Sequence, residues 1–157
     1  MKCWTNKKED EVLVKDVLKL ELIDRETGKV VKYAEGSNSL GSTGSVLLLM
    51  FISGHEEDAN KTKGWKYMYL FDGAKNYIKT LTGTFSTVTS NANYYYVVLT
   101  ALDTSTDSYT TVYQGLYHEE NVPILGMMNL WQNVTMTKPS DKILRAKWEV
   151  RIPYARL

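Results

Sequence analysis

Alternation of apolar and polar residues is the dominant pattern along this chain. The clearest example spans residues 142–152, where apolar side chains at every second position alternate with charged ones. Residues 12–24 show the same period, with Leu18, Leu20 and Leu22 on one face and charged residues on the other. Because consecutive side chains of a strand point to opposite faces of a sheet, both stretches are predicted to be half-buried β-strands.

The first of these strands is predicted to form a hairpin with the residues that follow it. Residues 26–29, with the sequence Glu-Thr-Gly-Lys, supply a turn in which Gly28 is free to adopt a positive φ. The returning strand is predicted at 29–35. The Gly/Ser-rich stretch 36–45 is then predicted to be a loop.

Seven consecutive apolar residues, 46–52, come next, and they are compatible with a buried strand or with a short buried helix. Ser45 before the run and Gly54 after it favour the two ends of a helix, so a short helix is the preferred interpretation. The charged stretch 55–63 that follows is predicted to be a loop.

Further strands are predicted along the rest of the chain, separated by turns rich in Asp, Asn and Gly. They span residues 65–71, 77–88, 94–102, 109–117, 124–130 and 134–137. Apolar or aromatic side chains occupy both faces of 94–102, which is typical of a central strand covered on both sides. The chain is therefore predicted to be all-β: an antiparallel β-sandwich, jelly roll or closed barrel with one short helix. We expect a polar arm at 1–11, a single β-domain at 12–152 and a C-terminal strap at 153–157.

Charged residues are scarce in the middle of the chain, and this limits the chemistry available there. Residues 67–137 hold only seven Asp, Glu, Lys or Arg. Asp72, Asp103 and Asp107 are among them, and each stands in a predicted turn, where its carboxylate is expected to accept backbone hydrogen bonds. We therefore expect a domain built for contact, with no catalytic residue.

No metal or cofactor site is expected either. His55 and His118 each stand beside acidic residues, but neither cluster has the ligand set of a zinc site or the spacing of a calcium loop. No serine lies in a nucleophile elbow, and the Gly-rich stretch 41–45 lacks the Lys of a phosphate-binding loop. A small glycosidase-like or lipocalin-like barrel would need a deep pocket with convergent polar groups, and nothing in the sequence indicates such a pocket.

Charge and hydropathy exclude two classes of partner. The formal net charge of +1 lacks the basic excess of a nucleic-acid-binding protein. The longest apolar run has seven residues, against the roughly twenty that a membrane-spanning helix needs. The polar residues 1–10 show no signal peptide. We therefore expect neither a nucleic acid nor a membrane as partner.

Aromatic residues are the strongest lead to a binding function. The chain has eleven Tyr and four Trp, which favour core packing or a protein interface and leave carbohydrate stacking as an alternative. Tyr94 and Tyr96 share one strand face, and Tyr113 is a further candidate. In the two terminal segments, the candidate partner contacts are Cys3, Trp4, Tyr154 and Leu157.

Several segments, taken in order, resemble virion proteins of tailed viruses, of the tail or capsid-decoration type. They are the hairpin 24–31, Asn38 with Gly44 and the run 46–52, the stretch 65–73, the triplet 115–117, and 138–141 with Leu144, Trp148 and Ile152. The resemblance implies a non-enzymatic β-sandwich subunit that binds other virion proteins. Because no signal peptide is expected, we expect synthesis in the host cytoplasm. A homo-oligomer is expected because the stretch 80–111 is rich in Thr and Ser and poor in the charges that guard a sheet against edge pairing, and a trimer is favoured. A carbohydrate-binding or receptor-binding module is the alternative.

Overall fold

The computed structural model describes residues 15–39, 65–120 and 124–153. Within these ranges the chain forms nine strands and one short 3-10 helix. They are β1 (Lys15–Asp24), β2 (Val30–Ser39), β3 (Tyr67–Phe71), β4 (Tyr77–Phe85), β5 (Thr89–Ser90), β6 (Tyr94–Asp103), β7 (Tyr109–Tyr117), η2 (Leu125–Met127), β8 (Leu130–Lys138) and β9 (Lys142–Pro153).

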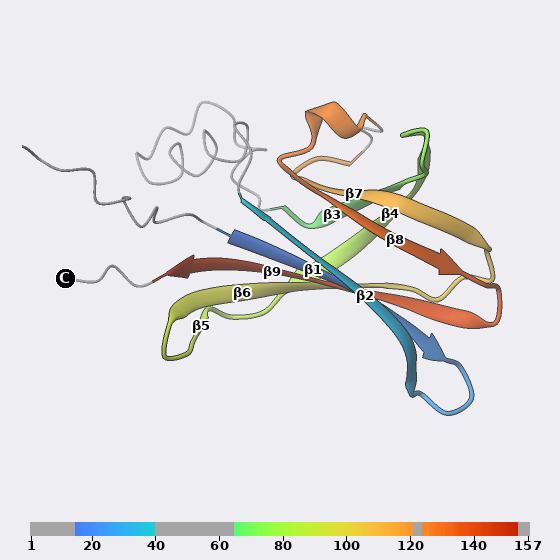
Figure 1. Ribbon diagram of the computed structural model, residues 1–157, viewed down its shortest axis with the longest axis horizontal. Helices are drawn as coiled ribbons and strands as arrows, with labels where there is room; N and C mark the ends of the chain where they lie inside the picture. The colour runs from blue at the N-terminus through green and yellow to red at the C-terminus, as the bar shows by residue number, and fades with distance from the viewer. Residues whose placement is uncertain (1–14, 40–64, 121–123, 154–157) are drawn as a thin grey trace, which may run out of the picture.

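The strands form two layers of one antiparallel sheet (Figure 1). The first layer has the order β2-β1-β9-β6, with β5 paired to β6, and the second has the order β4-β3-β7-β8. Strand β4 joins them, because its residues before Gly83 pair with β3 and Gly83–Phe85 pair with Leu99–Ala101 of β6. The predicted antiparallel all-β class is confirmed.

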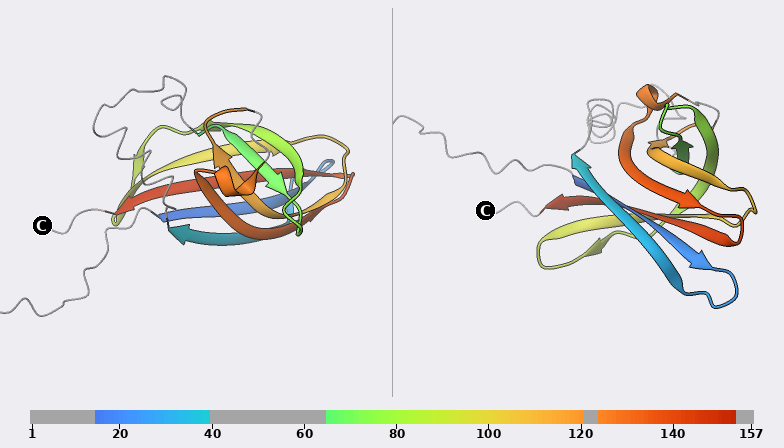
Figure 2. Two further views of the ribbon diagram at one scale, coloured as in Figure 1. Left: turned by 90° about the horizontal axis from the view of Figure 1, so that it is seen from above. Right: turned by 45° about the vertical axis from the view of Figure 1, so that its right-hand side comes forward.

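The sheet curls until its two edge strands lie close together, as the right-hand view of Figure 2 shows. Gly36 of β2 lies against β8, where a Cβ added to it would be 2.7 Å from Cγ2 of Val134. The result is a sandwich that nearly closes into a barrel. The main core lies between the layers and takes side chains from both. Its largest buried members are Leu18, Leu20, Met68, Leu70, Leu99, Leu116, Leu130, Met136 and Trp148.

The turn of the opening hairpin lies where the sequence predicts it, and Gly28 has the positive φ expected there. Gly28 has a φ of 66°, and the Asp24 carboxylate accepts hydrogen bonds from the N–H groups of Glu26 and Thr27. The hydrogen bonds of Thr27, with the charge of Lys142, lower the pKa of Asp24 to about 2. The returning strand runs to Ser39, so the predicted loop start at residue 36 is wrong. The hydrogen-bonded ladder between β2 and β1 continues as far as Ser39.

Residues 124–130 do not form the predicted strand. Leu125–Met127 form the 3-10 helix η2, and β8 begins at Leu130. The apolar residues of this stretch cover the outer face of the second layer, where Met128 joins a small cluster with Tyr69 and Phe71. The sequence of these residues resembles a strand because a segment that packs on the face of a sheet is as apolar as a buried strand.

Strand β6 is central in hydrogen bonding but is not covered on both sides. Leu99 and Ala101 are buried in the main core, whereas Leu102 on the opposite face is 52% exposed. The predicted strand 77–88 ends at Phe85, and the short β5 follows it. The predicted helix at 46–52 and the predicted arm at 1–11 lie outside the described residues, as does all of the predicted strap 153–157 except Pro153.

Candidate functional site

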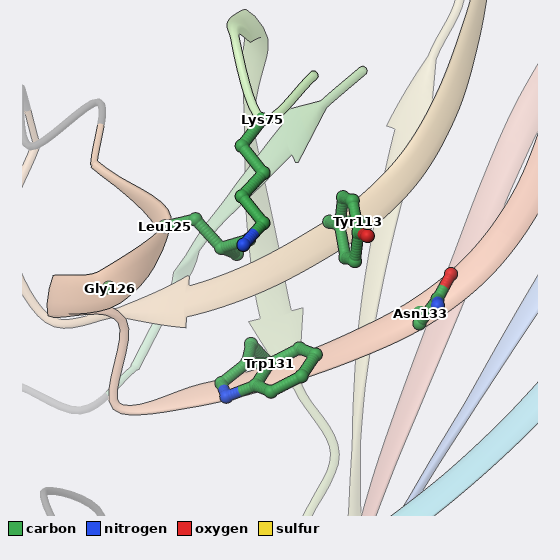
Figure 3. A pocket seen from close by; sticks show the side chains of 6 residues that line it. All are labelled: Lys75, Tyr113, Leu125, Gly126, Trp131 and Asn133. Carbon is green, nitrogen blue, oxygen red and sulfur yellow. The ribbon is translucent and has the colours of Figure 1, made fainter. Parts of the chain in front are cut away.

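An open hollow of about 410 Å³ lies on the outer face of the second layer. Its walls come from three parts of the chain: the β3–β4 turn, the 3-10 helix η2, and strands β7 and β8 (Figure 3). The lining residues are Lys75, Tyr113, Leu125, Gly126, Trp131 and Asn133.

Strand register places the floor of the hollow. Tyr113 of β7 pairs with Asn133 of β8, and Gly115 pairs with Trp131. Gly115 has no side chain, so Met128 fills the space above it. A Cβ at Gly115 would lie 2.1 Å from the Met128 Cγ. This contact holds the segment that carries η2 over the second layer, and η2 forms one wall of the hollow.

Two aromatic rings face the hollow from neighbouring strands. The ring centroids of Tyr113 and Trp131 are 6.3 Å apart, and the ring planes are inclined by 58°. Trp131 is 45% exposed. On β8 the residues that share its face are Asn133, Thr135 and Thr137, all exposed, so a single large aromatic stands on a polar strand face. Tyr113 is among the predicted contacts and Trp131 is not, although a single large aromatic on a polar strand face is visible in the sequence.

Lys75 projects into the hollow from a tight turn. The Asp72 carboxylate accepts hydrogen bonds from the N–H groups of Ala74 and Asn76, and these bonds lower its pKa. Lys75 itself has a φ of 67°, in the left-handed region that residues with a Cβ rarely adopt. Its Nζ lies 5.9 Å from the Tyr113 ring centroid.

The other predicted aromatic contacts lie elsewhere. Tyr94 and Tyr96 pack edge to face on β6, with centroids 5.7 Å apart, and the Arg151 guanidinium lies 4.7 Å from the Tyr94 ring. Trp65 packs against the main core. The structure therefore does not gather Tyr94, Tyr96 and Tyr113 into one patch. Cys3, Trp4, Tyr154 and Leu157 lie outside the described residues.

The outer face of the first layer is a second candidate. At the end next to the β1–β2 turn it carries exposed apolar side chains on both sides of an ion pair. Val31 is 55% exposed, Tyr33 63% and Leu102 52%. Between them Glu21 pairs across the strands with Tyr33 on one side and Arg145 on the other, and Arg145 pairs with Leu102. We call the set Val31, Tyr33, Leu102, Glu21 and Arg145 the outer patch.

Glu21 is only 3% exposed, although it stands on the outer face. The Arg145 Nε donates to its carboxylate at 2.6 Å, and the Lys19 and Lys147 ammonium groups lie 3.3 and 3.6 Å away. Burial opposes ionisation, but the hydrogen bonds from Arg145 and Lys19 outweigh it and lower the pKa of Glu21. The alternation in the sequence places these charged residues on the face opposite the leucines, but it does not show that they pair with one another.

Two buried polar side chains of the described residues, Asp103 and Lys138, are held by hydrogen bonds near the β6–β7 turn. Asp103 accepts hydrogen bonds from Tyr109 and from the Ser105 N–H, and Lys79 lies beside it. Burial opposes ionisation of Asp103, but these partners outweigh it and lower its pKa to about 2. The buried Lys138 ammonium donates to the carbonyls of Ser105 and Asp107. The turn chemistry predicted for Asp72 and Asp103 is thus present. The Asp107 carboxylate instead accepts hydrogen bonds from the side chains of Lys79 and Ser105, so the backbone hydrogen bonds predicted for it are wrong.

His118 is buried, not solvated as its acidic neighbours suggested. Its Nδ1 lies 3.0 Å from Oδ1 of Asn129, and its Nε2 lies 3.6 Å from a Glu119 oxygen. In the described part of the chain, no three His, Cys, Asp or Glu side chains gather as metal ligands would. A search of the same residues finds no helix with the length and hydropathy of a membrane span.

Comparisons of the chain with protein-family models, curated proteins and solved structures found no match. Functional proposals for this chain therefore rest on its own residues and geometry, together with the segment resemblance described above.

Proposed function

We propose that this chain is a non-enzymatic structural subunit of a tailed-virus particle, in the tail or on the capsid, and that it acts by assembling with copies of itself and with other virion proteins. The observation that carries the assembly part is the outer patch. The segment resemblance supports the virion part, because it runs in order through most of the chain.

The outer patch has the composition of a protein interface. Large apolar side chains lie on both sides of an ion pair between the buried Glu21 carboxylate and the partly exposed Arg145, and interface centres are rich in Tyr and Arg. The face also carries both signs of charge, with Lys19 and Lys147 near Glu35 and Glu149. A surface with both signs can complement a rotated copy of itself, so a second copy of the chain is the occupant that we propose.

A charge placed in the outer patch tests this proposal. Leu102→Asp puts a carboxylate where a neighbour would bury an apolar side chain. Burial of a leucine contributes about 1.5–3 kcal/mol, so the association constant is expected to fall at least tenfold. The measurement is oligomer mass by light scattering and native mass spectrometry over a range of chain concentrations.

The control is Ile124→Asp. Ile124 is 57% exposed, close to the value for Leu102, but it stands next to η2 beside the other layer. The control variant is expected to assemble as the unmodified chain does. A chain that is monomeric at every concentration, or that responds equally to both substitutions, contradicts the proposal. Absence of the chain from purified particles of the virus that encodes it contradicts the virion part.

A second candidate function is carbohydrate binding, and one observation favours it. The hollow beside Tyr113 places two aromatic rings, an amide and an ammonium group around one open space. Stacking of a sugar on aromatic faces, with polar groups at the rim, needs this combination. A ligand in this hollow and an assembly contact at the outer patch are compatible, since they lie on different layers.

A further inference from the structure

We propose that the hollow binds an acidic saccharide residue, one that carries a carboxylate, and that Lys75 is the residue that recognises its charge. This inference rests on the second candidate function, carbohydrate binding, and goes beyond it by naming the ligand class. It follows from the backbone of Lys75, the composition of the lining and the charge around it.

The first step concerns the backbone of Lys75. A residue with a Cβ in the left-handed region is less stable there than glycine, by about 1–2 kcal/mol, and asparagine also tolerates the region better. The β3–β4 turn nevertheless has lysine at this position. Strained positions that persist are concentrated at functional sites, and here the strained residue is one that lines the hollow.

The second step concerns the charge of Lys75. Among the described residues its recorded contact is with the Tyr113 ring, and no carboxylate pairs with it. The carboxylate in its own turn, that of Asp72, is engaged by two backbone N–H groups and by the Asn76 amide. An ammonium group that lines a hollow, with the carboxylate of its own turn engaged by other donors, suits a ligand that brings its own negative charge.

The third step concerns the rest of the lining. Tyr113 and Trp131 present ring faces suited to the C–H groups of a pyranose. Asn133 offers both a donor and an acceptor, which is what a pair of sugar hydroxyls needs. The volume of about 410 Å³ lies near the low end for small-molecule sites, so it fits one sugar residue with part of a neighbour.

The same lining disfavours a nucleic-acid strand. A phosphate backbone binds through several cations, and the affinity depends on their number. Among the described residues that line the hollow, Lys75 is the one that carries a charge. A ligand with a single negative charge therefore matches the site, and a polyphosphate does not.

The experiment is a titration of the full chain with glucuronic acid and N-acetylneuraminic acid, and with glucose as the neutral probe, followed by saturation-transfer NMR. Lys75→Gly removes the ammonium and the backbone strain together. It is expected to weaken binding of the acidic sugars about tenfold or more, to leave glucose unchanged, and to leave the melting temperature equal or higher.

Two further variants complete the design. Trp131→Ala removes the stacking surface and is expected to abolish binding of acidic and neutral sugars alike. Lys66→Ala is the matched control, because the Lys66 ammonium also lies over a tyrosine, 5.2 Å from the Tyr67 ring centroid, but outside the hollow. It is expected to change nothing.

The outcomes separate the inference from the function on which it rests. If glucose and the acidic sugars bind equally and Lys75→Gly has no effect, the charge recognition is overturned and carbohydrate binding stands. If no sugar binds, or if the signals do not depend on Trp131, both are overturned. A binding signal that Lys66→Ala reduces as much as Lys75→Gly also overturns the role of Lys75.

Discussion

At the scale of single residues, the most consequential side chain outside the hollow is Asp16. It is 1% exposed, and its Oδ2 accepts hydrogen bonds from the Gln132 Nε2 at 2.8 Å and from the Trp148 Nε1 at 2.7 Å. Burial raises its pKa above the ordinary value of 3.8, because the two hydrogen bonds do not fully offset the loss of water. The folded chain therefore binds this proton more tightly than the unfolded chain does.

The sign of the pH dependence follows from this difference. With respect to Asp16, the folded state is most stable when the carboxyl is protonated, and it loses stability as the pH rises through the folded-state pKa. Asp16→Asn removes the ionisation and keeps an acceptor oxygen. The stability of this variant relative to the unmodified chain is expected to increase between about pH 4 and pH 7, measured by urea unfolding.

Asp103→Asn is a control of opposite sign. The pKa of Asp103 is lowered to about 2, so its carboxylate stabilises the folded state above the unfolded-state value of 3.8, and this contribution disappears as the pH falls toward 2. The Asp103→Asn variant is therefore expected to have a lower free energy of unfolding than the unmodified chain near neutral pH, and this difference should shrink in acid. A stability difference for Asp16→Asn that stays constant with pH would contradict the raised pKa.

At the scale of elements, the contact between Gly115 of β7 and Met128, the residue after η2, controls how the 3-10 helix covers the second layer. Gly115→Ala forces the Met128 side chain away, because both its Cγ and its Cβ lie within 3 Å of the added atom. The expected cost is about 1–3 kcal/mol of unfolding free energy, measured in urea. Gly126→Ala is the matched control, since nothing lies within 4 Å of its added Cβ.

A double substitution tests whether the contact is the cause. In the Gly115→Ala background, Met128→Ala removes the obstructing Cγ and Sδ, so it should cost less stability there than it costs in the unmodified chain. The coupling free energy of the cycle is then clearly different from zero. Additive effects of the two substitutions would mean that Gly115 acts through something other than Met128.

The elements that could be predicted from the sequence are those with one buried face. Strands β1 and β9 bury every second side chain, so a period of two shows both the strand and its inner face. Strand β6 is harder to interpret, since its sequence is apolar on both faces, while in the structure Leu99 and Ala101 are buried and Leu102 and Tyr95 are exposed. Whether a face is covered depends on distant segments, which a local pattern does not contain.

The hollow illustrates a second limit. Tyr113 was a candidate, but Lys75, Trp131 and Asn133 come from other parts of the chain and meet it only through the register of β7 with β8 and through the left-handed turn. A pattern of alternation predicts strands without their register. The one local sign was Trp131, an aromatic on an otherwise polar strand face.

At the scale of the whole molecule, the backbone ladder that joins the two layers is short, but the layers share one core. Only three residue pairs of the ladder connect β4 to β6. The main cluster, in contrast, contains Leu18 and Trp148 from the first layer and Met68 and Leu116 from the second. Separation of the layers would expose all of these side chains, so neither layer is expected to persist without the other.

Because the two layers share one core, the chain is expected to unfold in a single transition. Trp148 on β9 is buried in the core, and Trp131 on β8 stands on the outer face of the other layer, so fluorotryptophan labels at the two positions report on different layers. The ¹⁹F NMR signals of both, assigned with Trp→Phe variants, should change with the same urea midpoint and the same slope. If Trp131 reached its unfolded signal at lower urea than Trp148, the second layer would be an independent unit. The shared core would then not be what holds the two layers together.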